Sequence, residues 1–76
     1  MEISKEAATT AAKRVTRRLC IVNNMHWHEL LRFEEAVCGP EQSRSYRSWI
    51  AFLLKLGLTE EQVFSTAQQR LDRVAS

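Results

Sequence analysis

Two cysteines and two histidines are the side chains whose chemistry could build a metal site or a nucleophile: Cys20, His26, His28 and Cys38. A zinc site needs four ligands that converge tetrahedrally, usually supplied by ligand pairs at short and characteristic spacings. Here each cysteine stands alone, and two histidines two positions apart point in different directions on a helix. We therefore predict no metal and no cofactor, and histidines that lie at a junction between helices.

A cysteine nucleophile is the second chemical possibility. It needs a neighbouring base, a third group that orients the base, and an oxyanion site inside a walled pocket. A chain of 76 residues needs its apolar residues for packing, because so small a domain buries only about 60% of its unfolded surface. We therefore predict no catalytic residue, no small-molecule substrate and no enzymatic activity.

A basic cluster is the first feature that could bind a partner. Lys13 and Arg17 are four positions apart, as are Arg14 and Arg18, so the cluster covers one broad helix face. Arg44 and Arg47 form a smaller basic group after Gly39-Pro40. Such a surface could neutralise phosphates, dock onto an acidic protein, or be no more than a solvated helix flank.

The balance of charge favours protein over nucleic acid as the partner. The formal net charge is only +2, which permits contact with nucleic acid without arguing for it. An acidic strip accompanies the basic residues and consists of Glu29, Glu34, Glu35 and Glu41. A mixed surface of this kind fits contact with another protein, or with a second copy of the chain, better than contact with a duplex.

The aromatic rings extend the same prediction. Most of the rings are expected in the core, Phe33, Phe52 and Phe64 among them. Large aromatics are also enriched at the buried centres of interfaces, and four short helices that cannot enclose all the rings would present some of them to a partner. We expect a homodimer and a contact surface made of Arg14, Arg17, Arg18, Trp27, Arg44, Tyr46, Arg47 and Trp49.

The second half of the chain predicts a helical hairpin. After the break at Gly39-Pro40, a helix is expected over about 41–56, and Gly57 stands where a helix stop would place a glycine. Thr59 and Gln62 have the spacing of a capping box for a second helix over about 60–74. The apolar faces of the two helices are Tyr46, Trp49, Ile50, Leu53 and Leu54, and Val63, Phe64, Ala67, Leu71 and Val74.

The first half has an almost unbroken apolar seam: Ala8, Ala12, Val15, Leu19, Val22, His26, Leu30, Phe33 and Val37. Residues 5–38 could form one long helix or two helices divided at Asn23-Asn24. We prefer two, because asparagine is a good N-cap and a poor residue inside a helix. One long helix would span about 50 Å, and a second copy would have to cover it.

A helix-turn-helix is the alternative interpretation of residues 47–74, and its turn is similar to turns of many bacterial regulators. The second helix would then read DNA with Gln62, Ser65, Thr66, Gln69, Arg70 and Arg73, whose amides, hydroxyls and guanidinium groups suit base edges and phosphates. Glu60 and Glu61 argue against it, because they would face phosphate at the end of the helix that enters the major groove.

The sequence as a whole predicts an all-α fold, a single domain over residues 1–76 that forms a small bundle of three or four helices. The first six residues lack the order of a signal peptide, and the longest apolar run, residues 49–54, is too short to span a bilayer. We expect a cytoplasmic protein without membrane contact, in which Cys20 and Cys38 are small buried residues and form no disulfide.

The segment Arg44-Ser45-Tyr46-Arg47, followed by an apolar helix, is similar to small helical regulators encoded by phages and mobile elements. The resemblance covers a short part of the chain and assigns no site residue. We expect a bacterial or phage accessory protein, an adaptor, inhibitor or chaperone-like regulator that binds another protein. A DNA-binding transcriptional regulator is the alternative function.

Overall fold

The computed structural model describes residues 3–39 and 45–75, and these ranges contain helices and no strand. The elements are α1 (Lys5–Val22), α2 (Trp27–Leu30), a 3-10 turn η1 (Leu31–Phe33), α3 (Glu34–Cys38), α4 (Tyr46–Lys55) and α5 (Glu60–Ala75). Because α2, η1 and α3 follow one another without a break, they form one bent helical segment. The predicted all-α bundle is confirmed.

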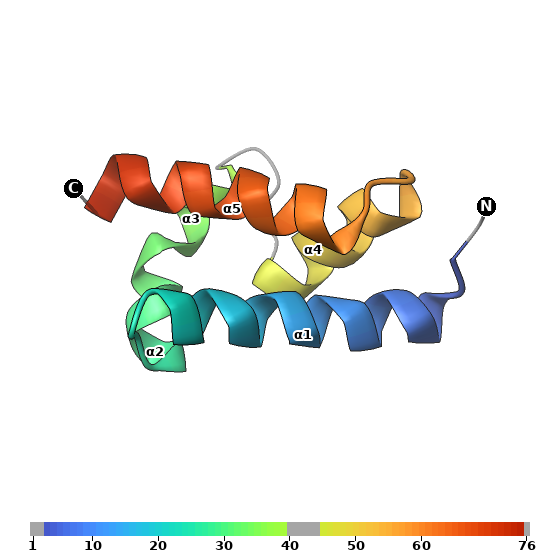
Figure 1. Cartoon of the computed structure of the whole chain (residues 1–76), viewed down its shortest axis with the longest axis horizontal. Helices are drawn as coiled ribbons and strands as arrows, with labels where there is room; N and C mark the ends of the chain where they lie inside the picture. The colour runs from blue at the N-terminus through green and yellow to red at the C-terminus, as the bar shows by residue number, and fades with distance from the viewer. Residues whose placement is uncertain (1–2, 40–44, 76) are drawn as a thin grey trace.

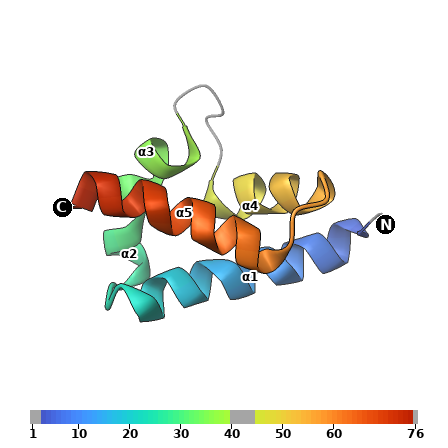
Figure 2. The ribbon, with the colours of Figure 1, turned by 45° about the horizontal axis from the view of Figure 1, so that its top comes forward.

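The two long helices, α1 and α5, lie side by side and run in the same direction (Figure 1). Helix α4 packs against both of them, and the bent segment from α2 to α3 leads from the end of α1 to the second half of α5 (Figures 1 and 2). The two ends of the chain therefore lie at opposite ends of the bundle.

The preferred division of the first half into two helices is confirmed, although asparagine acts differently from the prediction. Asn23 is the C-cap of α1, and Asn24 has a positive φ of 52°. Asparagine tolerates this left-handed conformation better than most residues. The N-cap of α2 is His26, whose backbone N–H donates to the Glu29 carboxylate at 3.3 Å. The asparagines thus end the first helix, and neither caps the second.

The start of α4 differs from the prediction. Ser45 is extended, and its hydroxyl accepts a hydrogen bond from the Ser48 amide at 3.2 Å. This N-cap fixes the first residue of the helix as Tyr46, so the predicted start near residue 41 is wrong. Residues 40–44 lie outside the described residues.

The turn between α4 and α5 confirms the prediction in detail. The amide of Gly57 donates to the Leu54 carbonyl and that of Leu58 to the Leu53 carbonyl, which is the hydrogen-bond pattern of a Schellman stop. Gly57 has a φ of 106°, a backbone conformation that a residue with a side chain would adopt only with strain. The Thr59 amide donates to Gln62 Oε1 at 2.8 Å, and the Gln62 amide donates to Thr59 Oγ1 at 3.1 Å. This reciprocal pair is the predicted capping box.

Tyr46 lies at the centre of the core and ties three elements together. Its hydroxyl donates to the Leu30 carbonyl at 2.9 Å, and its backbone N–H donates to the Glu34 carboxylate at 2.8 Å. Burial raises the pKa of the hydroxyl, so this group stays protonated and remains a donor. The other large buried side chains of this core are Leu19, Leu30, Val37, Trp49, Ile50, Leu54, Val63 and Leu71.

Three residues of the predicted apolar faces lie on the surface. Val22 and Val74 are exposed, each in the last turn of its helix at one end of the bundle (Figure 1). His26 is also exposed, because the chain leaves the axis of α1 before it. The apolar pattern of the sequence therefore extends beyond the part of each helix that neighbouring helices cover.

Candidate binding site: a basic groove beside α1

A hollow of about 380 Å³ opens where α1, α2 and the start of α4 meet, and we call it the notch. It is lined by Lys13, Thr16, Arg17, Cys20, Met25, His26, Trp27 and Arg47. Arg17, Trp27 and Arg47 were predicted as contact residues from three separate parts of the sequence. The structure brings these three together.

Trp27 forms an aromatic wall of the notch, and its ring contacts a buried residue of the core. Its ring centroid lies 5.9 Å from that of buried Tyr46, with the two planes at 59°. The Arg47 guanidinium lies over the indole, 5.9 Å from its centroid, within the range of a cation–π contact. Trp27 remains 39% exposed. The notch therefore offers an anchored apolar surface directly beside a positive charge.

A second hollow of about 330 Å³ lies between the first half of α1 and α4, and we call it the furrow. Its lining residues are Lys5, Thr9, Arg47, Ser48, Ala51, Phe52 and Lys55. Arg47 lines both hollows, so they adjoin. We call the notch and the furrow together the groove; it follows α1 along the side that faces α4.

The charged side chains that line the groove are all positive. Its lining contains five cationic side chains and no carboxylate: Lys5, Lys13, Arg17, Arg47 and Lys55. Within residues 3–39 and 45–75, ion pairs join Arg14 to Glu60 and Arg18 to Glu61, and neither pair includes a groove cation. A hollow lined by charges of one sign concentrates the field and attracts anionic groups.

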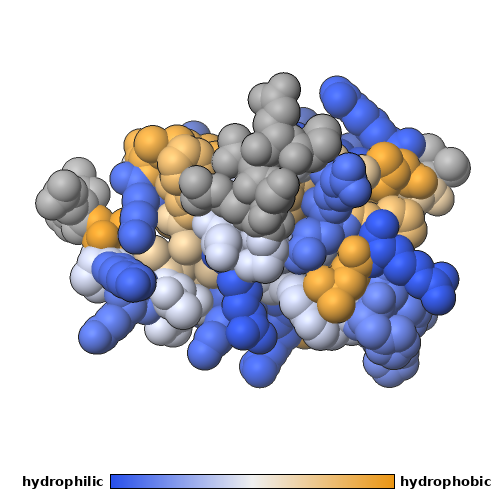
Figure 3. Space-filling model, turned by 180° about the vertical axis from the view of Figure 1, so that it is seen from behind, coloured by the Kyte–Doolittle hydropathy of each residue, from blue (hydrophilic) through white to orange (hydrophobic). Residues whose placement is uncertain are grey.

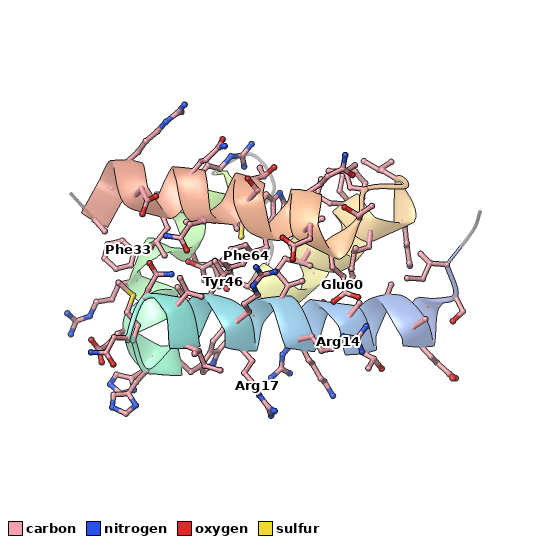
Figure 4. All side chains as sticks on the ribbon, viewed as in Figure 1. Arg14, Arg17, Phe33, Tyr46, Glu60 and Phe64 are labelled. Atoms are coloured by element: carbon pink, nitrogen blue, oxygen red, sulfur yellow. The ribbon has the colours of Figure 1, made fainter. Side chains whose placement is uncertain are left out.

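Arg14 and Arg18, also predicted to contact a partner, form ion pairs with α5 and do not line the groove. Arg14 Nε and Nη2 donate to the two carboxylate oxygens of Glu60 at 3.2 and 2.8 Å. Arg18 donates to Glu61 at 2.6 Å, and its guanidinium lies 3.9 Å from the centroid of the Phe64 ring. In Figure 4, Arg14 points toward Glu60, whereas Arg17 points away from α5. The predicted basic face is thus divided between a helix contact and the groove.

The Arg14–Glu60 pair predicts a pH-dependent difference in stability. The hydrogen bond to Arg14 lowers the pKa of Glu60 below its ordinary value, so the stabilisation is complete above the unfolded glutamate pKa and is lost as the pH falls through the folded one. Glu60→Gln should therefore lower the urea midpoint at pH 7, by a small amount because the pair is solvent-exposed. This difference should shrink as the pH falls toward 3 and Glu60 becomes protonated. A midpoint difference that persists at pH 3 would mean that the charge of Glu60 is not its cause.

The structure corrects the predicted aromatic patch. Tyr46 and Trp49 are 0% and 3% exposed, because both lie on the face of α4 that packs into the core, and neither can contact a docked partner. Phe52, predicted as a core residue, is 36% exposed and lines the furrow. It lies outside the apolar stripe of α4, on the face of Ser48 and Lys55, and that spacing could have identified it. The remaining predicted residue, Arg44, lies outside the described residues.

The predicted DNA-reading face of α5 is partly used within the bundle. Gln62 forms the capping box, and the Thr66 hydroxyl donates to the Gln62 carbonyl at 2.9 Å. Arg70 donates to the Val37 carbonyl at 2.7 Å and lies 5.3 Å from the centroid of the Trp49 ring. Ser65, Gln69 and Arg73 are exposed. A hollow of about 560 Å³ lies beside Gln62, Ser65 and Thr66, and its lining includes the Glu61 carboxylate and no cation.

The cysteines and histidines make no reactive cluster in the described part of the chain. Both cysteines are free, and burial raises the pKa of Cys38 to about 12. Burial also raises the pKa of Cys20. Thiols of this kind stay protonated at neutral pH and are poor nucleophiles. The rings of His26 and His28 stack with centroids 5.5 Å apart, and no group of three potential metal ligands exists among the described residues.

None of the described helices combines the length and the apolar character needed to cross a bilayer. Comparison of the chain with protein-family models, with curated proteins and with solved structures finds no match.

Proposed function

We propose that this protein is a small binding module whose groove receives an acidic segment of another protein, and that it acts as an adaptor or inhibitor without enzymatic activity. The observation that carries the proposal is the composition of the groove. Five cations line it without a carboxylate, and the exposed Trp27 and Phe52 both line it as well. Cations steer an acidic partner, and exposed rings supply the apolar contact that stabilises the complex.

The dimensions of the groove fit an extended peptide. Lys5, at one end of the lining, and Cys20, at the other, are fifteen positions apart on α1, which corresponds to about 22 Å at 1.5 Å per residue. An extended chain covers this length with about seven residues. A short acidic segment would thus be long enough to contact both hollows at once.

The contacts of Trp27 favour protein over nucleic acid. Single-stranded nucleic acid binds by stacking its bases on free aromatic faces along a basic channel. The Arg47 guanidinium already lies over the indole of Trp27, and the net charge of the whole chain is only +2. The indole is therefore better placed to meet an apolar side chain than a stacked base.

Self-association stays a prediction. Large apolar side chains are exposed outside the groove as well, among them Ile21, Leu31 and Leu56. Figure 3 shows one face of the molecule, where hydrophobic residues gather over the end of α4 and in smaller patches, with hydrophilic side chains projecting between them. A dimer could cover part of this surface, and sedimentation at several concentrations measures whether it does. The predicted cytoplasmic location agrees with the two free thiols.

A peptide titration tests the proposal. The probe is a fluorescein-labelled peptide of about seven residues that contains glutamates and two leucines, and its control has glutamine in place of every glutamate. We expect micromolar binding of the acidic peptide, weakening as salt rises, and no comparable binding of the control. Failure of the acidic peptide to bind at low salt would refute the proposal. Tighter binding of a short oligothymidine would assign the groove to nucleic acid instead.

A further inference from the structure

The notch differs from the furrow in the chemistry of its cations. Two of its three positive groups are guanidinium groups, Arg17 and Arg47, and Lys13 supplies the third. The furrow adds two single ammonium groups, Lys5 and Lys55, to the shared Arg47. Guanidinium groups present several N–H donors in a planar fork, which suits a phosphoryl group with three acceptor oxygens.

We propose that the notch is a subsite for the phosphoryl group of a phosphoserine or phosphothreonine within the acidic segment; this inference rests on the proposed function. The charges support it. A phosphoryl group carries about −1.5 to −2 at neutral pH, so it balances the three cations that line the notch better than a carboxylate does. Within the described residues, no carboxylate shares the notch or pairs with its cations.

The walls of the notch also suit this ligand. Trp27 lies against Arg47 and holds the guanidinium at the rim of the notch, while the edges of a stacked guanidinium keep their donors available. The Thr16 hydroxyl already donates to the Ala12 carbonyl at 2.6 Å. The phosphoryl oxygens would therefore take their hydrogen bonds from the three cations, and the exposed indole would contact the peptide beside the phosphorylated residue.

The geometry of α1 also predicts how far apart two residues of the bound peptide lie: the phosphorylated residue in the notch and an apolar residue in the furrow. Thr16 lines the notch and Thr9 lines the furrow, seven positions apart on one helix. Seven positions correspond to about 10 Å along the axis, which is about three residues of an extended chain. An apolar side chain about three positions from the phosphorylated residue would lie in the furrow beside Phe52.

Three peptides that differ at one central position test the inference: phosphoserine, glutamate and serine. We expect the phosphoserine peptide to bind about tenfold more tightly than the glutamate peptide, a difference of about 1.4 kcal/mol. Arg17→Gln should reduce this preference to less than about threefold, because it removes one guanidinium from the notch. Arg32→Gln should leave the preference unchanged, since Arg32 is exposed and lines neither hollow.

The outcomes separate the two proposals. Equal affinity for phosphoserine and glutamate would refute the phosphoryl subsite and leave the acidic groove intact. Binding of none of the three peptides would refute both. Inorganic phosphate serves as the competitor, and we expect it to displace the phosphopeptide only far above the concentration of the peptide itself. Displacement at equal concentrations would mean that the notch binds a free anion, which also contradicts the inference.

Discussion

A chain in which alanine replaces Tyr46 is expected to lose about 3–5 kcal/mol of its free energy of unfolding, the usual cost of removing a buried aromatic ring. Tyr46 is fully buried, and its hydroxyl donates to the Leu30 carbonyl. Removal of the ring opens a cavity where α2, α3 and α4 meet. A domain of this size is stable by about 4–11 kcal/mol at 0.05–0.15 kcal/mol per residue, so the variant should be largely unfolded under mild denaturing conditions.

The matched control is Tyr46→Phe, which keeps the ring and removes only the hydroxyl. It should cost about 1 kcal/mol, the typical net value of one hydrogen bond. Urea unfolding followed by circular dichroism at 222 nm measures both variants. A loss of less than about 1 kcal/mol for Tyr46→Ala would contradict the central position of this residue in the core.

The double variant Arg17→Glu with Arg47→Glu is expected to weaken binding of the acidic peptide by about 100-fold or more. Arg47 lines both hollows and Arg17 lines the notch, so reversal of the two charges sets carboxylates against an acidic ligand. Like charges placed together across an interface cost several kcal/mol, and 100-fold corresponds to about 2.7 kcal/mol. Fluorescence polarisation of the labelled peptide measures the change.

Single reversals provide the controls for charge. Arg32→Glu changes the net charge by as much as Arg17→Glu, but Arg32 lies outside the groove. We expect it to alter the affinity by less than about threefold, because salt screens the interaction between this distant charge and the peptide. Circular dichroism checks that every variant remains helical. If Arg32→Glu and Arg17→Glu weakened binding equally, the effect would come from total charge and not from the groove.

The parts of the fold that depend on neighbouring residues could be predicted from the sequence. The stop at Gly57 and the capping box of Thr59 and Gln62 use hydrogen bonds between residues a few positions apart, and each follows from residue type and spacing. The division of the first half at Asn23-Asn24 is of the same kind. The cap at Ser45 is local as well, but the stronger break at Gly39-Pro40 suggested an earlier start for α4.

The candidate site could be predicted only in part, because it depends on how distant segments cross. Arg14 and Glu60 are 46 positions apart, and no spacing rule shows that this arginine is bound to α5 while Arg17 faces solvent. The groove joins residues of α1 and α4 with Trp27 of α2 in the same way. Periodicity could separate Phe52 from the core face of α4, whereas the lone lysines Lys5, Lys13 and Lys55 form no motif that would assign them to one surface.

The groove is the surface on which the whole account depends, and amide chemical-shift mapping of the isotopically labelled protein tests it most directly. If the acidic peptide binds in the groove, its addition should shift the amide signals of Lys13, Arg17 and Arg47 and the indole N–H signal of Trp27, which line the notch. Changes confined to the exposed face of α5, at residues such as Ser65 and Gln69, would contradict it.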